Sequence, residues 1–280
     1  ILYTEYALKR KNRRDIDFLS IILVLPMKIA TAAYPLGPVS RWSDYAEKLE
    51  SWIAEAAGQG ADLLVFPEYG AMELATLAGR EVAADGEACL RAVSDLVPEA
   101  DALHAGMATK YGVHICAGSA PVFDDEIGHR PVNRARLFAP SGAMGVQDKQ
   151  IMTRYERDVM AVGPGRPLRH FDTALGRIGI LICYDAEFPV LGRAFKDADV
   201  ILAPSCTEAL SGYWRVRIGA MARALETQCV SVMASLVGSF DGCPHAAANT
   251  GMGGVFAPPD AGFPPTGVLA EGTLNQPGWT

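Results

Sequence analysis

The stretch GRIGILICYDAEFP, residues 176–189, decides the fold class. Its isoleucines at 178, 180 and 182 alternate with other residues in a run that is too short for a helix, so it predicts a buried strand. Cys183 follows at the end of this strand, before two acids, Asp185 and Glu187, and then Pro189. The next residues, VLGRAFKDA, predict a helix. Cys183 therefore lies at a strand-to-helix turn, where a side chain is lifted clear of the sheet and backbone N–H groups point at the atom it attacks.

Strands and helices alternate through the rest of the chain. Apolar runs predict strands at 28–34, 61–66, 113–118, 134–138, 144–149, 199–204 and 229–236, with a closing hairpin from 251–257 and 267–271. Apolar residues at helical spacing predict helices at 42–57, 86–111 and 213–227. Two predicted strands resemble a weak internal repeat, since ADLLVFPE at 61–68 and ADVILAPS at 198–205 both end in proline and a polar residue. This pattern predicts an α/β fold in which two sheets pack together with helices outside.

Composition narrows the class of protein. The 280 residues are half hydrophobic, which is enough for one large core. A net charge of −7 argues against a nucleic-acid partner and against an anionic membrane surface. The six cysteines are scattered without CxxC pairs, which favours reduced thiols in a cytoplasmic protein over disulfides or a zinc site. We therefore expect no metal and no cofactor.

The first 26 residues need a separate interpretation. LKRKNRR at 8–14, followed by FLSIILVLP at 18–26, imitates the charged and apolar regions of a secretory signal. The apolar run has about nine residues, well short of a membrane span, and the candidate cleavage run at 30–32 falls inside the first predicted strand. Met27 is a natural start for the domain. We expect residues 1–26 to be an extension, a linker or an expression remnant, and residues 27–280 to be one domain.

Three chemically complementary residues stand at predicted strand ends: Glu68, Lys149 and Cys183. A thiol that attacks a carboxamide needs a base for its proton, a donor for the oxyanion and an acid for the departing amine. A glutamate can be both base and acid, and a lysine ammonium can hold the oxyanion together with the Tyr184 backbone N–H. Each residue also has an ordinary explanation, as a buried small hydrophobe, a helix cap or a solvated lysine.

A family resemblance joins these residues. PEYG at 67–70, KQIMTRYER at 149–157 and CYDAEFP at 183–189 resemble, in this order, the Glu, Lys and Cys motifs of the carbon–nitrogen hydrolase (nitrilase) superfamily. The resemblance extends from about Met27 to the last residue. It implies a four-layer α-β-β-α sandwich with a catalytic triad of Glu68, Lys149 and Cys183. It also implies that Glu156 matches a second glutamate that lies next to the site.

Finer motifs point to one branch of the superfamily. PEYGAMEL at 67–74 and SCTEALSGYWRVR at 205–217 resemble a branch whose hydrolase domain is often joined to an N-terminal acetyltransferase domain. Residues 1–26 are too few for such a domain, so whether the full gene product carries one is left open. Members of the family usually continue past the stretch that matches NQPGWT at 275–280, so truncation at Thr280 is also left open.

The resemblance implies a cysteine hydrolase of a small linear amide, which forms a thioester and releases ammonia or an amine. A nitrilase or an N-carbamoyl hydrolase on the same triad is the alternative, because CYD is typical of amide and carbamoyl hydrolases while KxxxTxxER is nitrilase-like. A non-catalytic binding or scaffold protein that kept the fold is the alternative from another class. Tyr69, Glu187 and Trp214 are candidates for the substrate pocket.

Three further expectations concern residues near these motifs. An acid directly after a strand is most often a helix N-cap, so we expect Asp185 to cap the following helix. Cys206 follows a strand end without a motif match, so we expect it to be structural. Residues 211–227 carry apolar side chains around much of a helix, which predicts a second buried face and hence a homodimer or a higher homo-oligomer.

Overall fold

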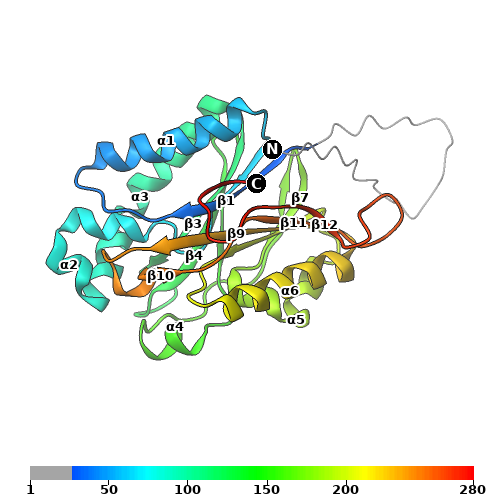
Figure 1. Ribbon diagram of the computed structural model, residues 1–280. Helices are drawn as coiled ribbons and strands as arrows, with labels where there is room; N and C mark the ends of the chain where they lie inside the picture. Colours follow the sequence, from blue (N-terminus) through cyan, green and yellow to red (C-terminus); the bar gives the residue numbers. More distant parts are fainter. Residues whose placement is uncertain (1–26) are drawn as a thin grey trace.

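The computed structural model describes residues 27–280, so the extension predicted for residues 1–26 lies outside the described residues. The chain forms the four-layer α-β-β-α sandwich that was expected (Figure 1). Five strands form the first half of the sandwich: β1 (Ile29–Pro35), β2 (Leu63–Val65), β3 (His114–Val122), β4 (Val132–Phe138) and β5 (Met144–Asp148). Four strands form the second half: β6 (Phe171–Thr173), β7 (Gly176–Ile180), β8 (Val200–Ser205) and β9 (Val230–Ser239).

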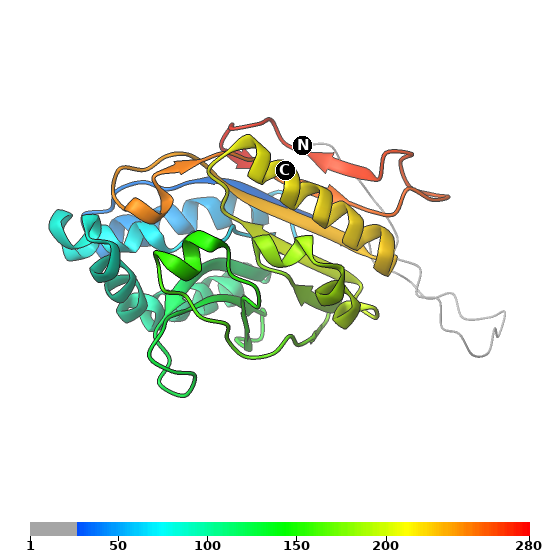
Figure 2. The same ribbon diagram turned by 90° about the horizontal axis from the view of Figure 1, so that it is seen from below.

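Helices cover both outer faces, as Figures 1 and 2 show from two directions. The α-helices are α1 (Trp42–Gly58), α2 (Arg80–Ala84), α3 (Gly86–Tyr111), α4 (Arg154–Asp158), α5 (Pro189–Gly192) and α6 (Leu210–Thr227). Short 3₁₀ turns are η1 (Met72–Ala78), η2 (Cys183–Glu187), η3 (Arg193–Phe195) and η4 (Pro244–Ala246). α1 and α3 lie over the first half, and α5 and α6 lie over the second.

β1 joins the two halves. Its first residues, 29–31, pair in parallel with β2, and its last residues, 33–35, pair in parallel with β9. The hydrogen-bonded order is therefore β5-β4-β3-β2-β1-β9-β8-β7-β6. The remaining strands extend from this path: β10 (Ala248–Asn249), β11 (Gly254–Phe256), β12 (Val268–Glu271) and β13 (Gly278–Trp279). β11 pairs with β12 and β9, as the predicted closing hairpin requires, and β13 pairs with β1.

Two apolar cores hold the layers together. In the first, Leu49 and Ile53 of α1 and Val93 of α3 pack on one face of the first half, against Leu64 and Ile115. The opposite face of the same strands belongs to the second core, which also contains the second half and the inner side of α6. Successive residues of a strand point to opposite faces, so Leu63 and Val65 enter the second core while Leu64 enters the first.

The segment around Cys183 differs from its prediction in two ways. β7 ends at Ile180, three residues before Cys183, and the chain then enters η2. The helix predicted from VLGRAFKDA is replaced by the four-residue α5 followed by η3. Gly192 lies close to α6, because a Cβ at this position would lie 2.6 Å from Arg223 Cδ.

Candidate functional site

The Cys183 turn is strained and tightly packed. Cys183 has φ +50°, in the left-handed region that costs a residue with a side chain about 1–3 kcal/mol, and such outliers gather at active sites. The turn is held against α6 at Gly219, where a Cβ would lie 2.6 Å from the Ala186 carbonyl oxygen. Only glycine allows η2 to approach the helix this closely. The result is a buried cysteine, 4% exposed, held at the end of β7.

Glu68 is placed by a second strained turn. It follows β2, and Tyr69 after it has φ +56°. Ser119 of β3 fixes this turn, because its hydroxyl accepts a hydrogen bond from the Tyr69 N–H at 2.9 Å. Gly118 permits the contact, since a Cβ there would lie 2.8 Å from the Cα of Gly70. Glu68 is 1% exposed.

Lys149 comes directly after β5. Its backbone N–H donates to the Asn133 carbonyl of β4 at 2.9 Å, so the hairpin of β4 and β5 fixes its position. Its side chain is 1% exposed. Glu156 comes seven residues after Lys149 in the sequence and lies in α4. There Thr153 and Glu156 form a reciprocal capping box.

These side chains meet in one buried cluster. Lys149 Nζ lies 2.7 Å from Glu68 Oε1, and 2.8 and 2.7 Å from the two carboxylate oxygens of Glu156. The Cys183 thiol lies 3.7 Å from the Cys206 carbonyl oxygen, and the charges of Glu68 and Lys149 both act on its pKa. The structure therefore brings together Glu68, Lys149 and Cys183, with Glu156 beside them.

The two glutamates have opposite electrostatic environments. Burial raises the pKa of Glu68, and the nearby charge of Lys149 only partly offsets this effect. Burial acts on Glu156 too, but Lys149 outweighs it and lowers the Glu156 pKa. A pair of acids whose pKa values move apart is typical of a site in which one stays ionised and the other carries protons.

Lys149 and Cys183 also have shifted pKa values. Burial alone would lower the pKa of Lys149, but the charges of Glu156 and Glu68 raise it well above its usual range. Burial and the charge of Glu68 raise the pKa of the Cys183 thiol, while Lys149 opposes them. The resting thiol is therefore protonated.

Sequence reasoning missed one side chain that links the two glutamates. Asn133 Nδ2 donates to Glu68 Oε1 at 2.9 Å and to Glu156 Oε1 at 3.1 Å. Asn133 lies on β4 in no recognisable motif, and only the pairing of β4 with β5 brings it beside Lys149.

Cys206, which was expected to be structural, touches the cluster through its main chain. Its backbone N–H donates to Glu68 Oε2 at 3.0 Å, and its carbonyl oxygen faces the Cys183 sulfur. The position that follows β8 therefore contributes main-chain groups to the site, which the side-chain type could not reveal.

The expectation that Asp185 caps the following helix is wrong. Its carboxylate accepts hydrogen bonds from the backbone N–H groups of Ile151 at 2.8 Å and of Gln150 at 3.1 Å. The reason is that the predicted helix is reduced to the four-residue α5, which begins only at Pro189. The N–H groups that follow Lys149 lie within hydrogen-bond distance of Asp185 instead. Burial raises the pKa of Asp185 to about 7.

The remaining predicted residues have different surroundings. Tyr69 is buried, and its hydroxyl donates to Glu156 Oε1 at 2.9 Å. Glu187 forms an ion pair with Arg215 of α6 at 2.7 Å. Trp214 is half exposed on α6 and packs on the neighbouring Tyr213 ring.

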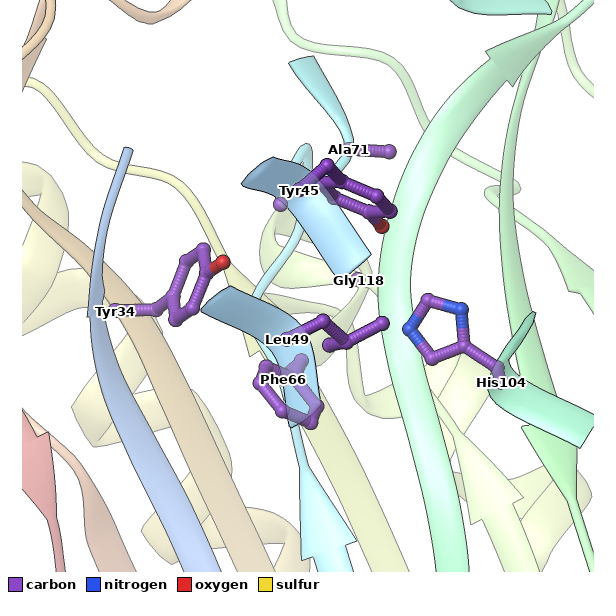
Figure 3. Close-up of a pocket in the computed structure, with 8 residues that line it drawn as sticks. Tyr34, Tyr45, Leu49, Phe66, Ala71, His104 and Gly118 are labelled. Atoms are coloured by element: carbon purple, nitrogen blue, oxygen red, sulfur yellow. The ribbon is translucent and has the colours of Figure 1, made fainter. Parts of the chain in front are cut away.

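A small cavity lies away from this cluster, in the first core. Figure 3 shows it between Tyr34, Phe66 and His104. Its volume of about 10 Å³ is close to the space that one water molecule needs. It is too small for a substrate.

Metal and membrane sites were not found within residues 27–280. No group of three His, Cys, Asp or Glu side chains in this range is arranged to hold a metal ion. No helix in the same range combines the length and the apolar character needed to cross a bilayer.

Comparison with known proteins gives a consistent family. The model of the carbon-nitrogen hydrolase family matches residues 28–256. The chain is 32% identical over 252 residues to the probable hydrolase YhcX of Bacillus subtilis. The aligned region covers 89% of this chain and 48% of that protein. It is 34% identical over 146 residues to the deaminated glutathione amidase of Yersinia enterocolitica, covering 47% of this chain and 50% of the relative. The chain thus spans about half the length of these two relatives.

A solved structure shares the fold. An amidase of the nitrilase superfamily from Nesterenkonia sp. superposes with a TM-score of 0.67 at 22% identity, over 90% of this chain and 88% of that one. In another structure of that amidase, the acetamide moiety of fluoroacetamide is added covalently to the active site cysteine.

Proposed function

Because the chain belongs to the carbon–nitrogen hydrolase family, we propose that it hydrolyses a small linear amide with Cys183 as nucleophile. The observation that carries this proposal is the buried cluster in which Lys149 contacts Glu68 at 2.7 Å while both side chains act on the Cys183 thiol. Relatives named as amidases support an amide as the substrate class.

The first half of the reaction forms a thioester. Glu68 takes the thiol proton as the sulfur attacks the amide carbon, and the carbonyl electrons move to oxygen. The Lys149 ammonium and the Tyr184 N–H stabilise this oxyanion, which is the largest contribution in most acyl transfers. Glu68 then gives its proton to the leaving nitrogen, the C–N bond breaks, and ammonia or an amine departs.

The second half restores the enzyme. Glu68, ionised again, removes a proton from water, whose oxygen attacks the thioester carbon. The C–S bond breaks, the carboxylic acid leaves, and the proton on Glu68 returns to the sulfur. The raised pKa of Glu68 suits this exchange, because a general acid–base works best with a pKa near the operating pH. Glu156 remains ionised as the counter-ion of Lys149.

Labelling and turnover test this proposal together. Fluoroacetamide is a weak electrophile, so an activated thiol should react with it far faster than the five other cysteines, which serve as internal controls. We expect intact-mass and peptide analysis to place one carbamidomethyl group on Cys183. Ammonia release from simple primary amides should disappear in Cys183→Ala. Equal labelling of several cysteines, or full turnover in that variant, would reject the proposal.

The same assay separates the alternatives. Nitriles and N-carbamoyl compounds included in the substrate panel would identify a nitrilase or a carbamoyl hydrolase if they alone release ammonia. A scaffold protein would neither label nor turn over.

We also propose a homodimer through α6. Leu210, Ile218 and Leu225 are 48%, 62% and 51% exposed on this helix, and Val190 is 68% exposed on the neighbouring α5. Large apolar side chains gathered on exposed helices in this way are typical of a subunit interface.

Two broader proposals concern the setting of the protein. All six cysteines are free, which supports a reducing cytoplasm. The motifs PEYGAMEL and SCTEALSGYWRVR support the branch that is often joined to an acetyltransferase domain, and sequencing the gene around this region would test that placement.

A further inference from the structure

Asp185 occupies an unusual position for a buried acid. It is 1% exposed, lies two residues after Cys183, and directs its carboxylate at the chain that follows Lys149. Oδ1 accepts from the Ile151 N–H at 2.8 Å, and Oδ2 accepts from the Gln150 N–H at 3.1 Å. Its partners are thus peptide groups of a loop, and no ion pair to an arginine or lysine is formed by this carboxylate within residues 27–280.

These two peptide groups control where Lys149 lies. On its N-terminal side, Lys149 is fixed because its own N–H donates to the Asn133 carbonyl of β4. On its C-terminal side the chain leaves the sheet, and Asp185 holds the next two N–H groups. The Lys149 backbone is therefore held from both directions, by β4 and by the Cys183 turn.

The connection between the two segments is short. One residue separates Lys149 from the second N–H that Asp185 binds, and one residue separates Asp185 from Cys183. A movement of the cysteine turn is transmitted through the carboxylate to the lysine, and the reverse also holds. An asparagine amide keeps one oxygen that can accept both N–H groups, at 3.2 and 2.8 Å from Asp185 Oδ1, but it loses the second oxygen and the charge of the carboxylate, whereas an alanine loses both acceptors.

We propose that Asp185 is a positioning residue that sets the Lys149 ammonium in register with the Cys183 sulfur and with the oxyanion. This inference rests on the proposed amide hydrolysis. A displacement of about 1 Å at such a site can reduce the rate about 10²-fold, so loss of this link should appear in kcat.

Asp185→Ala and Asp185→Asn test the proposal, with Asp199→Ala as the matched control. Asp199 also accepts a backbone N–H, from Arg177 at 2.7 Å, but at the amino ends of β7 and β8, away from Cys183. With the best primary amide of the panel, we expect kcat to fall about 10²-fold in Asp185→Ala and about tenfold in Asp185→Asn, with KM changed less than threefold. Asp199→Ala should keep the wild-type kcat.

A second readout reports the lysine directly. The rate of Cys183 alkylation by iodoacetamide, measured against pH, gives the apparent pKa of the thiol. Displacement of the Lys149 ammonium removes a charge that favours thiolate, so the profile of the Asp185 variants should move to higher pH. A loss of stability alone would leave this profile in place, as in Asp199→Ala.

The outcomes are distinguishable. Wild-type kcat and a wild-type alkylation profile in Asp185→Ala would overturn the positioning role. If that variant does not fold, the same two results in Asp185→Asn would overturn it. Full turnover in Cys183→Ala would instead reject the proposed hydrolysis and leave the link between the two segments as a structural one.

Discussion

Replacement of Glu68 by Gln should separate catalysis from stability, when it is compared with Glu156→Gln. In Glu68→Gln the new amide oxygen can still accept from Lys149 Nζ and Asn133 Nδ2, which lie 2.7 and 2.9 Å from Glu68 Oε1. The amide nitrogen then faces the Cys206 N–H, which loses its acceptor. One buried N–H without a partner costs about 1–3 kcal/mol of folding free energy.

Glu156→Gln should destabilise the fold more. Glu156 is the two-point partner of Lys149, at 2.8 and 2.7 Å, and the remaining Glu68 has a raised pKa. Removing one partner of a buried ion pair costs about 3–5 kcal/mol. Differential scanning calorimetry should show this difference, since 1 kcal/mol shifts the Tm of a domain of this size by about 2–4 °C.

Catalysis should follow the opposite order. Glu68→Gln removes the proton carrier, so the rate of acyl-enzyme formation should fall by about 10²–10⁴. Glu156→Gln acts through the position of Lys149 and should cost about 10². Ammonia release and intact-mass detection of the acyl adduct measure both steps. An adduct that forms and hydrolyses at the wild-type rate in Glu68→Gln would refute the role given to Glu68.

Three further predictions follow from the same structure. Cys183→Ser should lower ammonia release by more than about 10³-fold while amide binding by calorimetry persists, because a buried hydroxyl is a much weaker nucleophile than a thiol; turnover near wild type would contradict this. Asp185 has a folded pKa of about 7, above about 3.9 when unfolded, so the native state binds this proton more tightly. The free energy that this protonated carboxyl contributes to folding is full below about pH 4 and is lost as pH rises to about 7, by up to about 4 kcal/mol. Urea unfolding at pH 5 and at pH 8 should therefore give different free energies of unfolding, and this difference should be smaller in Asp185→Asn. Ile218→Lys should convert a dimer to a monomer in sedimentation equilibrium, whereas a monomeric wild-type protein would remove the case for the α6 interface.

Periodic elements could be predicted closely from the sequence. The helix predicted at 86–111 matches α3 residue for residue, because Tyr111 is followed by Gly112 in the left-handed conformation that ends helices. β7, β8 and β9 were also found, since buried parallel strands are continuous apolar runs. Glu68, Lys149 and Cys183 stood at predicted strand ends, and the resemblance to the carbon–nitrogen hydrolase superfamily joined them as one predicted site.

The contacts between segments could not be predicted in this way. Asn133 reaches the site through the register of β4 against β5, and Cys206 reaches it through main-chain atoms that any residue carries. Asp185 was predicted to cap the following helix because an acid directly after a strand usually does so. In the structure its carboxylate instead accepts hydrogen bonds from the backbone N–H groups of residues 150 and 151. Motifs identified the reactive side chains, and only tertiary structure showed what holds them.

The sharing of β1 between both halves of the sandwich has a consequence for folding during synthesis. Within residues 27–280, β1 leaves the ribosome before its partners β9 and β13. Thr31 exchanges backbone hydrogen bonds with Thr280 at 3.0 Å in both directions. At about 5–20 residues per second, this edge waits on the order of tens of seconds for its partner. The nascent chain must therefore protect an apolar strand edge while the residues from β2 to β13 are translated.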